Sequence, residues 1–182
     1  MIKKEIYPKT QRVICDGVKI QITEKLDGSN LVIFKKSDRL YIAQRNNIFE
    51  LEEINENKDK LYKGLCQWIV YNEETLKNEL NDGSAICGEW LGMGKLKYDV
   101  TEFDKRFYMF AKANITDDFS LTNLIYNHDL FIYSFVNKEV PYCVGIVPVV
   151  TEIQNIPNKR QLDKMYAEYC NRVNRNVERF CS

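Results

Sequence analysis

The stretch Ile22-Thr23-Glu24-Lys25-Leu26-Asp27-Gly28-Ser29-Asn30 decides how the rest of this 182-residue chain is interpreted. Before it, residues 18–23 alternate apolar and polar side chains, which is the period of a half-buried strand. After it, residues 30–34 form a second, mostly apolar strand. The stretch is therefore expected to hold a short loop, residues 24–29, between two strands.

Lys25 is the residue of chemical interest in this loop. An ammonium group taken out of water must be paired or lose its proton, and a partly neutral lysine is a nucleophile for phosphorus or a carbonyl carbon. Asp27 can approach Lys25, and Gly28 allows either a close approach of the backbone to a ligand or a positive φ. The same residues also fit a charged, solvated turn, so the loop alone leaves both interpretations open.

Strand and helix patterns extend on both sides of the loop. Asp16-Gly17 predicts the turn of a hairpin that precedes residues 18–23, and Lys36-Ser37-Asp38 predicts the turn after the next strand. Further strands are expected at residues 40–43, 84–92, 106–111, 129–136 and 143–149, and amphipathic helices at 61–80 and 158–180, the latter capped by Asn158. This pattern predicts an α+β fold with largely antiparallel sheets and flanking helices.

Composition places the chain among ordinary globular domains. Its length predicts one domain, residues 1–182, and its 26 basic and 26 acidic residues cancel, so any nucleic-acid binding must use a local patch. No apolar stretch suits a membrane span or a signal peptide, which predicts a soluble protein of the cytoplasm or another reducing compartment. The six cysteines lack a Cys-x-x-Cys pair and His128 lacks neighbouring ligands, so the sequence suggests neither a zinc site nor disulfides.

Four short motifs resemble those of a known family. Lys25-Leu26-Asp27-Gly28 is similar to motif I of the covalent nucleotidyltransferases, the superfamily of ATP- or NAD-dependent DNA ligases, RNA ligases and mRNA-capping enzymes. Gln44-Arg45-Asn46-Asn47 resembles motif Ia, Cys87-Gly88-Glu89-Trp90-Leu91-Gly92 resembles motif III, and Phe107-Tyr108-Met109-Phe110-Ala111 resembles motif IIIa. The four stand in the family's order. Glu24 before the lysine and Asn30 after it resemble the RNA-ligase branch.

The resemblance implies a fold and a reaction. The fold would be an ATP-grasp-like nucleotidyltransferase adenylation domain, truncated at its C-terminal end. In this family the lysine attacks the α-phosphorus of ATP, expels pyrophosphate and holds AMP, which implies Lys25 as the nucleophile and ATP and Mg²⁺ as cofactors. AMP then passes to a 5′-phosphorylated polynucleotide end, RNA more than DNA, and a 3′-hydroxyl attacks and releases it.

The resemblance also assigns roles to other motif residues. Asp27 would help to position Lys25 and a nucleotide phosphate. Arg45 offers a planar set of donors to ribose or phosphate, and Glu89 would accept hydrogen bonds from ribose hydroxyls. Phe110 would stack on the adenine ring. No metal ligand is identified.

Two residues of the branch and several basic side chains complete the expectation. Glu24 would contact the exocyclic amine of adenine, and Asn30 would serve the later steps on nucleic acid. A local groove for nucleic acid is expected from Lys95, Lys97, Lys105, Arg106 and Lys112, and a weaker phosphate-facing surface from Lys159, Arg160, Lys164, Arg172, Arg175 and Arg179. Both sets also fit an ordinary solvated surface.

Two motifs of the family are not found after residue 111. Motif IV is a Glu-Gly pair before a β-branched strand and supplies a carboxylate that positions the metal, and motif V is a Lys-x-Lys strand that offsets negative charge on phosphorus. Three explanations are open: a fragment, a two-chain enzyme whose partner chain supplies these motifs, or a shortened domain. We therefore predict an ATP-dependent RNA ligase-like adenylyltransferase. The alternatives are a non-catalytic nucleotide- or RNA-end-binding module and, less favoured, a capping guanylyltransferase.

Overall fold

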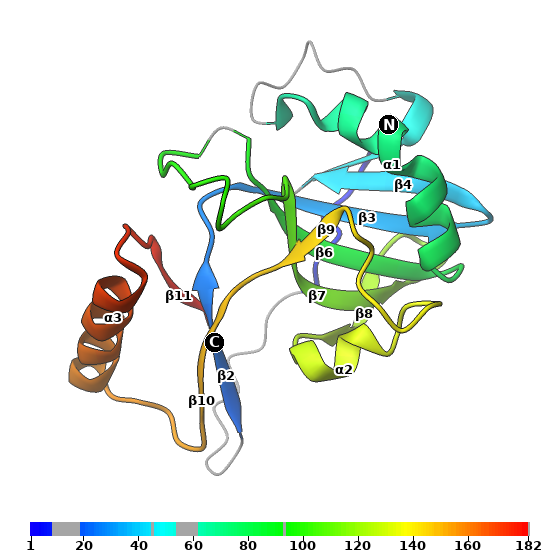
Figure 1. The fold of residues 1–182 in the computed structure, drawn as a ribbon. Helices are drawn as coiled ribbons and strands as arrows, with labels where there is room; N and C mark the ends of the chain where they lie inside the picture. Colours follow the sequence, from blue (N-terminus) through cyan, green and yellow to red (C-terminus); the bar gives the residue numbers. More distant parts are fainter. Residues whose placement is uncertain (9–18, 45, 54–61, 93, 182) are drawn as a thin grey trace. The chain divides into compact units, whose positions relative to one another are not determined.

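The computed structural model describes residues 1–8, 19–44, 46–53, 62–92 and 94–181. The hairpin turn predicted at Asp16-Gly17 and the predicted site residue Arg45 lie outside these residues. The chain divides into two compact units, each built from two separate segments (Figure 1). The first contains Met1–Lys9 and Gly28–Ile146, and the second contains Thr10–Asp27 and Val147–Ser182.

The first unit is built on an eight-stranded sheet within the described residues. Its strands lie in the order β1 (Ile2–Lys3), β5 (Asn47–Glu50), β4 (Arg39–Gln44), β3 (Ser29–Lys36), β6 (Ser84–Trp90), β7 (Phe107–Ile115) and β8 (Leu121–Ile125), and β9 (Val144–Ile146) also pairs with β7. Neighbouring strands are antiparallel, except that β7 and β9 are parallel. The largely antiparallel sheet predicted from the sequence is confirmed.

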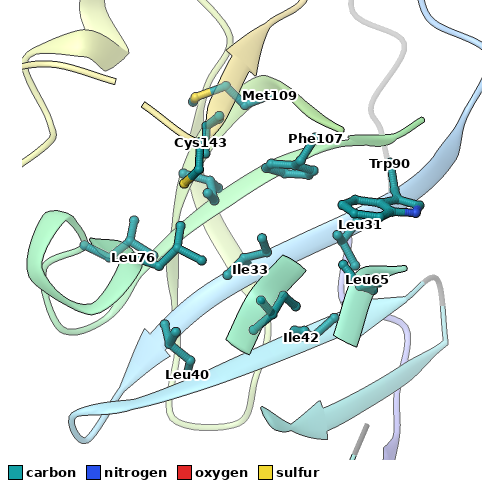
Figure 2. Close-up of a cluster of buried hydrophobic side chains, with 14 of the residues drawn as sticks. Leu31, Ile33, Leu40, Ile42, Leu65, Leu76, Trp90, Phe107, Met109 and Cys143 are labelled. Atoms are coloured by element: carbon teal, nitrogen blue, oxygen red, sulfur yellow. The ribbon is translucent and has the colours of Figure 1, made fainter. Parts of the chain in front are cut away.

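Side chains on the two faces of this sheet belong to two different clusters, because successive residues of a strand point to opposite faces. On β3, Leu31 and Ile33 join the cluster that also contains α1 (Leu65–Glu79) and residues of α2 (His128–Ile132). Figure 2 shows Leu65 and Leu76 of α1 in the cluster that also contains Ile33 and Ile42 of the sheet. Val32 and Phe34 join the second cluster, with Ile6, Ala43 and Cys87. All four β3 side chains are fully buried.

The second unit is a three-stranded antiparallel sheet with one helix. Its strand order is β10 (Val149–Ile153), β2 (Ile20–Lys25) and β11 (Arg179–Cys181), and the helix is α3 (Lys159–Val173) (Figure 1). Tyr166 and Tyr169 of α3 pack edge-on against Phe180 of β11, with ring centroids 5.4 and 5.6 Å apart. Asn158 caps α3 as predicted, in a capping box with Gln161.

Two predicted elements differ from the structure. The strand predicted at residues 129–136 is wrong, because this segment begins with the short helix α2, which Asn127 caps by accepting a hydrogen bond from the Leu130 amide. The helix predicted over residues 158–180 is confirmed only to Val173. Asn174 ends it in the left-handed conformation, with φ 52°, and the chain then returns as β11.

Other boundaries are closer to expectation. The helix predicted at 61–80 begins at Leu65 in the structure, after Gly64 with φ 83°. Ser37 and Asp38 both have positive φ, which confirms the tight turn between β3 and β4. Residues 143–149 contain β9 and only the first residue of β10, and the strands β1, β5, β8 and β11 were not predicted.

Candidate functional site

Lys25 is the last residue of β2 rather than part of a loop. Its Nζ lies 2.6 Å from Oε2 of Glu178, and the two side chains are 28% and 33% exposed. Arg179 is the register partner of Lys25 on β11, and its Nε lies 3.7 Å from the other oxygen of Glu178. The Glu178 carboxylate thus binds the amine of Lys25 and also contacts a second cation. An amine held at a strand end and partly open to solvent can act as a nucleophile once it loses its proton.

Glu24 precedes Lys25 in β2 and has different surroundings. Its side chain is fully buried, and its two oxygens accept hydrogen bonds of 2.5 and 2.6 Å from the two terminal nitrogens of Arg175. Tyr169 donates a third hydrogen bond of 3.0 Å. Burial, followed by the charge of Glu24, raises the pKa of Tyr169 to about 12, so this hydroxyl keeps its proton. The contact of Glu24 with adenine stays a prediction, and three protein donors already occupy this carboxylate.

A row of polar side chains crosses the first unit. Asn30 of β3, Glu89 of β6 and Tyr108 of β7 are successive register partners, so they lie side by side on one face of the sheet. The row lies on the same face of the sheet as Val32 and Cys87. Val32 is two residues after Asn30 on β3, and Cys87 is two residues before Glu89 on β6, and side chains two residues apart on a strand point to the same face. The predicted residues Asn30 and Glu89 are therefore neighbours.

Tyr7 lies beside this row. Its pKa is raised far above the ordinary value by burial first and then by Cys87, whereas an interaction with the Asn30 side chain lowers it. Burial also raises the pKa of Cys87, to about 12. Among the described residues, neither the Tyr7 hydroxyl nor Oδ1 of Asn30 has a hydrogen-bond partner of good geometry, although both atoms are buried. Buried polar atoms without partners are costly, and a ligand that supplied hydrogen bonds would relieve that cost.

Gly28 is explained by packing against the strand that carries Glu89. A Cβ at residue 28 would lie 2.7 Å from the carbonyl oxygen of Trp90 and 3.2 Å from Cβ of Glu89. Gly28 is not among the described residues with positive φ. Neither reason considered from the sequence accounts for Gly28 here, because the close approach is to the backbone of β6 rather than to a ligand.

Phe110 occupies a β-bulge. Cys87 pairs with Ala111 and Gly88 with Met109, so Phe110 is the extra residue of β7. The bulge shifts the alternation of β7: Met109 packs in the first cluster, whereas Ala111 packs in the second. Phe110 is half-buried against the second cluster, on the same face as Cys87. The structure thus brings Phe110 to the face that carries Asn30 and Glu89.

Comparison with known proteins shows the family and the fold of this chain. Residues 18–178 match the RNA ligase family. The chain belongs to the RNA ligase family. Among solved structures it is similar to Naegleria gruberi RNA ligase, with a TM-score of 0.55 and 20% identity to a form solved with ATP and manganese, and 0.54 and 20% to a form with AMP and manganese. No curated protein sequence matches the chain.

The likeness to the Naegleria structures concerns the fold. The comparison covers 91% of this chain but only 45% and 46% of those two chains, so this member of the RNA ligase family spans less than half of their length. At 20% identity, the likeness confirms the predicted α+β fold of an RNA ligase adenylation domain.

The basic groove expected in this RNA ligase family member needs one correction. Lys112 is buried, donates a 3.0 Å hydrogen bond to the carbonyl of Ser134 and lies 3.9 Å from the ring centroid of Phe135. Burial lowers its pKa to about 8. The alternation of β7 after the bulge turns this side chain inward, so Lys112 does not line a surface. Arg175 needs a similar correction, since it lies beyond α3 and is bound to Glu24.

Two functional candidates were missed in the sequence, Glu178 and Tyr169, whereas Arg175 was assigned to a phosphate-facing surface instead of to Glu24. Glu178 stands directly before a short strand beside Lys25, but Arg179 follows it where a Glu-Gly pair was sought. No local signal marks Glu178, because its contact with Lys25 joins parts of the chain that are far apart in the sequence. Asp27 lies half-buried in the segment between β2 and β3.

Neither a ready-made metal cage nor a membrane helix is found in the part of the chain that the structure describes. No cluster of three or more His, Cys, Asp or Glu side chains could hold a metal ion there. None of the described helices is both long and apolar enough to cross a bilayer.

Proposed function

We propose that this chain is the adenylation module of an ATP-dependent RNA ligase. The amine of Lys25 attacks the α-phosphorus of ATP, a phosphorus–nitrogen bond forms, and the bond to pyrophosphate breaks. The AMP then passes from Lys25 to the 5′-phosphate of a polynucleotide end, RNA in preference to DNA. Attack by a 3′-hydroxyl joins the strands and releases AMP.

One observation carries this proposal: in a chain of the RNA ligase family, the amine of Lys25 ends a strand, partly exposed, against the carboxylate of Glu178. The pair holds the amine in one position before the substrate arrives, which favours attack on a positioned phosphorus. We assign to Glu178 the carboxylate role that the family gives to the glutamate of motif IV.

The nucleoside is assigned to the face of the first unit that carries Asn30, Glu89 and Phe110. Glu89 accepts hydrogen bonds from the ribose, and Phe110 stacks on the adenine. The buried oxygen of Asn30, which has no partner of good geometry among the described residues, fits a ligand that donates hydrogen bonds. Arg45 and Asp27 are proposed to bind phosphate and to position Lys25, respectively.

A divalent cation, Mg²⁺, is part of the proposal. Magnesium in nucleotide enzymes is usually held by one or two carboxylates together with substrate phosphates, so a dedicated cage of protein ligands is not required. Glu178 is a hard oxygen ligand of the appropriate kind beside Lys25. When bound, the cation supplies positive charge that offsets the negative charge on the phosphates.

A second candidate is a module that binds a nucleotide or an RNA end without catalysis. The specific observation in its favour is that the amine of Lys25 is already engaged by the carboxylate of Glu178, 2.6 Å away. Under this alternative, ATP binds but no bond to Lys25 forms. A further possibility within the first candidate is that a partner chain supplies the positive charge that the family places at the phosphorus.

Labelling with ATP separates the two candidates. Incubation with α-labelled ATP and Mg²⁺ should leave a label that survives denaturation, and Lys25→Arg should abolish it because the charge stays while the nucleophile is lost. Lys19→Arg is the matched control, since Lys19 is an exposed lysine one residue before the same strand. ATP binding without label in the wild-type protein would favour the binding module. Label that forms only after a second polypeptide is added would show that a partner completes the site.

A further inference from the structure

Two ion pairs join the same two segments of the second unit. On one face of β2, Glu24 is bound by Arg175, and on the other face Lys25 is bound by Glu178. Glu24 and Lys25 are consecutive residues, and only Asn176 and Val177 separate Arg175 from Glu178. The segment that leads into β11 is therefore attached to β2 at two points close together.

The two pairs differ in burial. The side chains of Glu24 and Arg175 are 0% and 14% exposed, whereas those of Lys25 and Glu178 are 28% and 33% exposed. The buried pair is bidentate and receives a third hydrogen bond from Tyr169. Burying two charges is costly, and the best-attested use of such a pair is to specify register rather than to add stability. The exposed pair contains the nucleophile.

β11 pairs with β2 through only three of the described residues, so its register depends on few contacts. Arg179, Phe180 and Cys181 pair with Lys25, Glu24 and Thr23. A slip by one residue would turn Phe180 away from the rings of Tyr166 and Tyr169, because it moves each side chain to the other face. So short a strand has few backbone hydrogen bonds to resist such a slip. The clamp of Arg175 on Glu24 fixes the chain just before β11.

We propose that Arg175, together with Tyr169, is a positioning residue for the nucleophile: by holding Glu24 it fixes β11 in register on β2 and thereby places Glu178 on the amine of Lys25. This inference rests on the proposed function of Lys25 and deepens it. It gives Glu24 a supporting role, through the strand, in place of contact with adenine.

The double variant Glu24→Met, Arg175→Met tests this proposal. It removes both charges together, and replacing a buried ion pair by apolar side chains of similar size is commonly neutral or stabilising. The matched control is Lys19→Met, Glu152→Met, which removes an ion pair on the exposed side of the same sheet. Two quantities are measured: the rate and ATP KM of lysyl-AMP formation, and the rate at which sulfosuccinimidyl acetate acetylates Lys25, followed by peptide mass spectrometry.

The double variant should keep its melting temperature, lose about tenfold or more in the rate at saturating ATP, and keep its KM within about twofold. Acetylation of Lys25 should become faster because the amine leaves Glu178. The control should match the wild type in both measurements. Wild-type adenylation and acetylation rates in a folded double variant would overturn the proposal, since Phe180 alone would then fix the register.

Two further outcomes keep the proposals separable. If the wild-type protein forms no lysyl-AMP, either alone or with a second polypeptide added, the proposed function fails. Equal acetylation of Lys25 in the wild type and the double variant would overturn the positioning role as well. If the double variant does not fold, Tyr169→Phe takes its place, because it removes one hydrogen bond from Glu24 and keeps the ring. A rate reduced severalfold at unchanged KM is then expected, and a wild-type rate would contradict the proposal.

Discussion

Lys25 and Lys112 have the same side chain but lie in different surroundings. Lys25 is partly exposed and ion-paired, whereas Lys112 is buried under the ring of Phe135. Burial lowers the pKa of Lys112 to about 8. However, its amine donates a hydrogen bond to a backbone carbonyl and is buried, so a substrate cannot reach it. A perturbed pKa marks a functional site only when the group can also be reached. Accessibility and a fixed partner support the proposal that Lys25 is the nucleophile.

Replacing Lys112 by Met should stabilise the protein at neutral pH by roughly 1–3 kcal/mol, because a buried charge is removed. Between about pH 8 and the ordinary lysine pKa of about 10.4, Lys112 is protonated in the unfolded chain but neutral in the folded protein. The free energy of unfolding of the wild-type protein therefore increases as the pH rises through this window. The advantage of the variant should therefore shrink toward high pH.

Urea unfolding at about pH 7 and about pH 9.5 measures this difference. Lys97→Met is the matched control, because Lys97 is exposed, and its effect should be small at both pH values. A Lys112→Met variant that is less stable than the wild type at neutral pH would show that the hydrogen bond to Ser134 outweighs the cost of burial.

At the level of elements, the strands and helices that depend on a local pattern of apolar residues could be predicted from the sequence. The alternation around β3 and the helical spacing of Leu65, Ile69 and Leu76 in α1, which are four and seven residues apart, are visible in the chain and are confirmed. The segment at 129–136 is a short apolar run, for which strand and helix cannot be told apart by period alone. The buried residues His128, Phe131 and Phe135 follow helical spacing, and the Asn127 cap was the overlooked signal.

Long-range pairing could not be predicted in this way. Val177 continues the apolar spacing of α3 by coincidence, because Asn174 has already ended the helix and Val177 packs in the following segment. The pairing of β11 with β2 joins residues about 150 positions apart, and no local pattern encodes it. For this reason Lys25 was predictable from its motif, whereas its partner Glu178 was not.

The capping box of α3 gives a prediction at this scale. Asn158→Ala should lower the free energy of unfolding by about 1 kcal/mol, since the amide of Gln161 loses its acceptor at the helix start. The same substitution at Asn171, an exposed position inside α3, should be neutral or slightly stabilising because alanine is the better helix former. Denaturant unfolding of the two variants makes the comparison, and equal effects would show that the cap contributes nothing.

At the scale of the whole molecule, the burial of side chains is uneven. The first unit contains two clusters of buried side chains, one on each face of its sheet, whereas the second unit buries few apolar residues, among them Ile22, Val147 and Val177. Local stability follows buried apolar area, and elements that bind ligands are commonly drawn from the less stable regions. The proposed nucleophile lies in the second unit.

The rates of amide hydrogen exchange should therefore differ between the two units. Amides of β3 and β6, whose side chains fill both clusters, should exchange most slowly, and those of β10 and β11 at least about tenfold faster, which corresponds to about 1.4 kcal/mol or more. Peptides from residues 30–36 and 84–90 can be compared with those from 149–153 and 177–181 by mass spectrometry. If the amides of all four regions exchanged with the same free energy of opening, the chain would unfold as a single cooperative unit. The second unit would then owe its stability to the rest of the molecule rather than to its own small core.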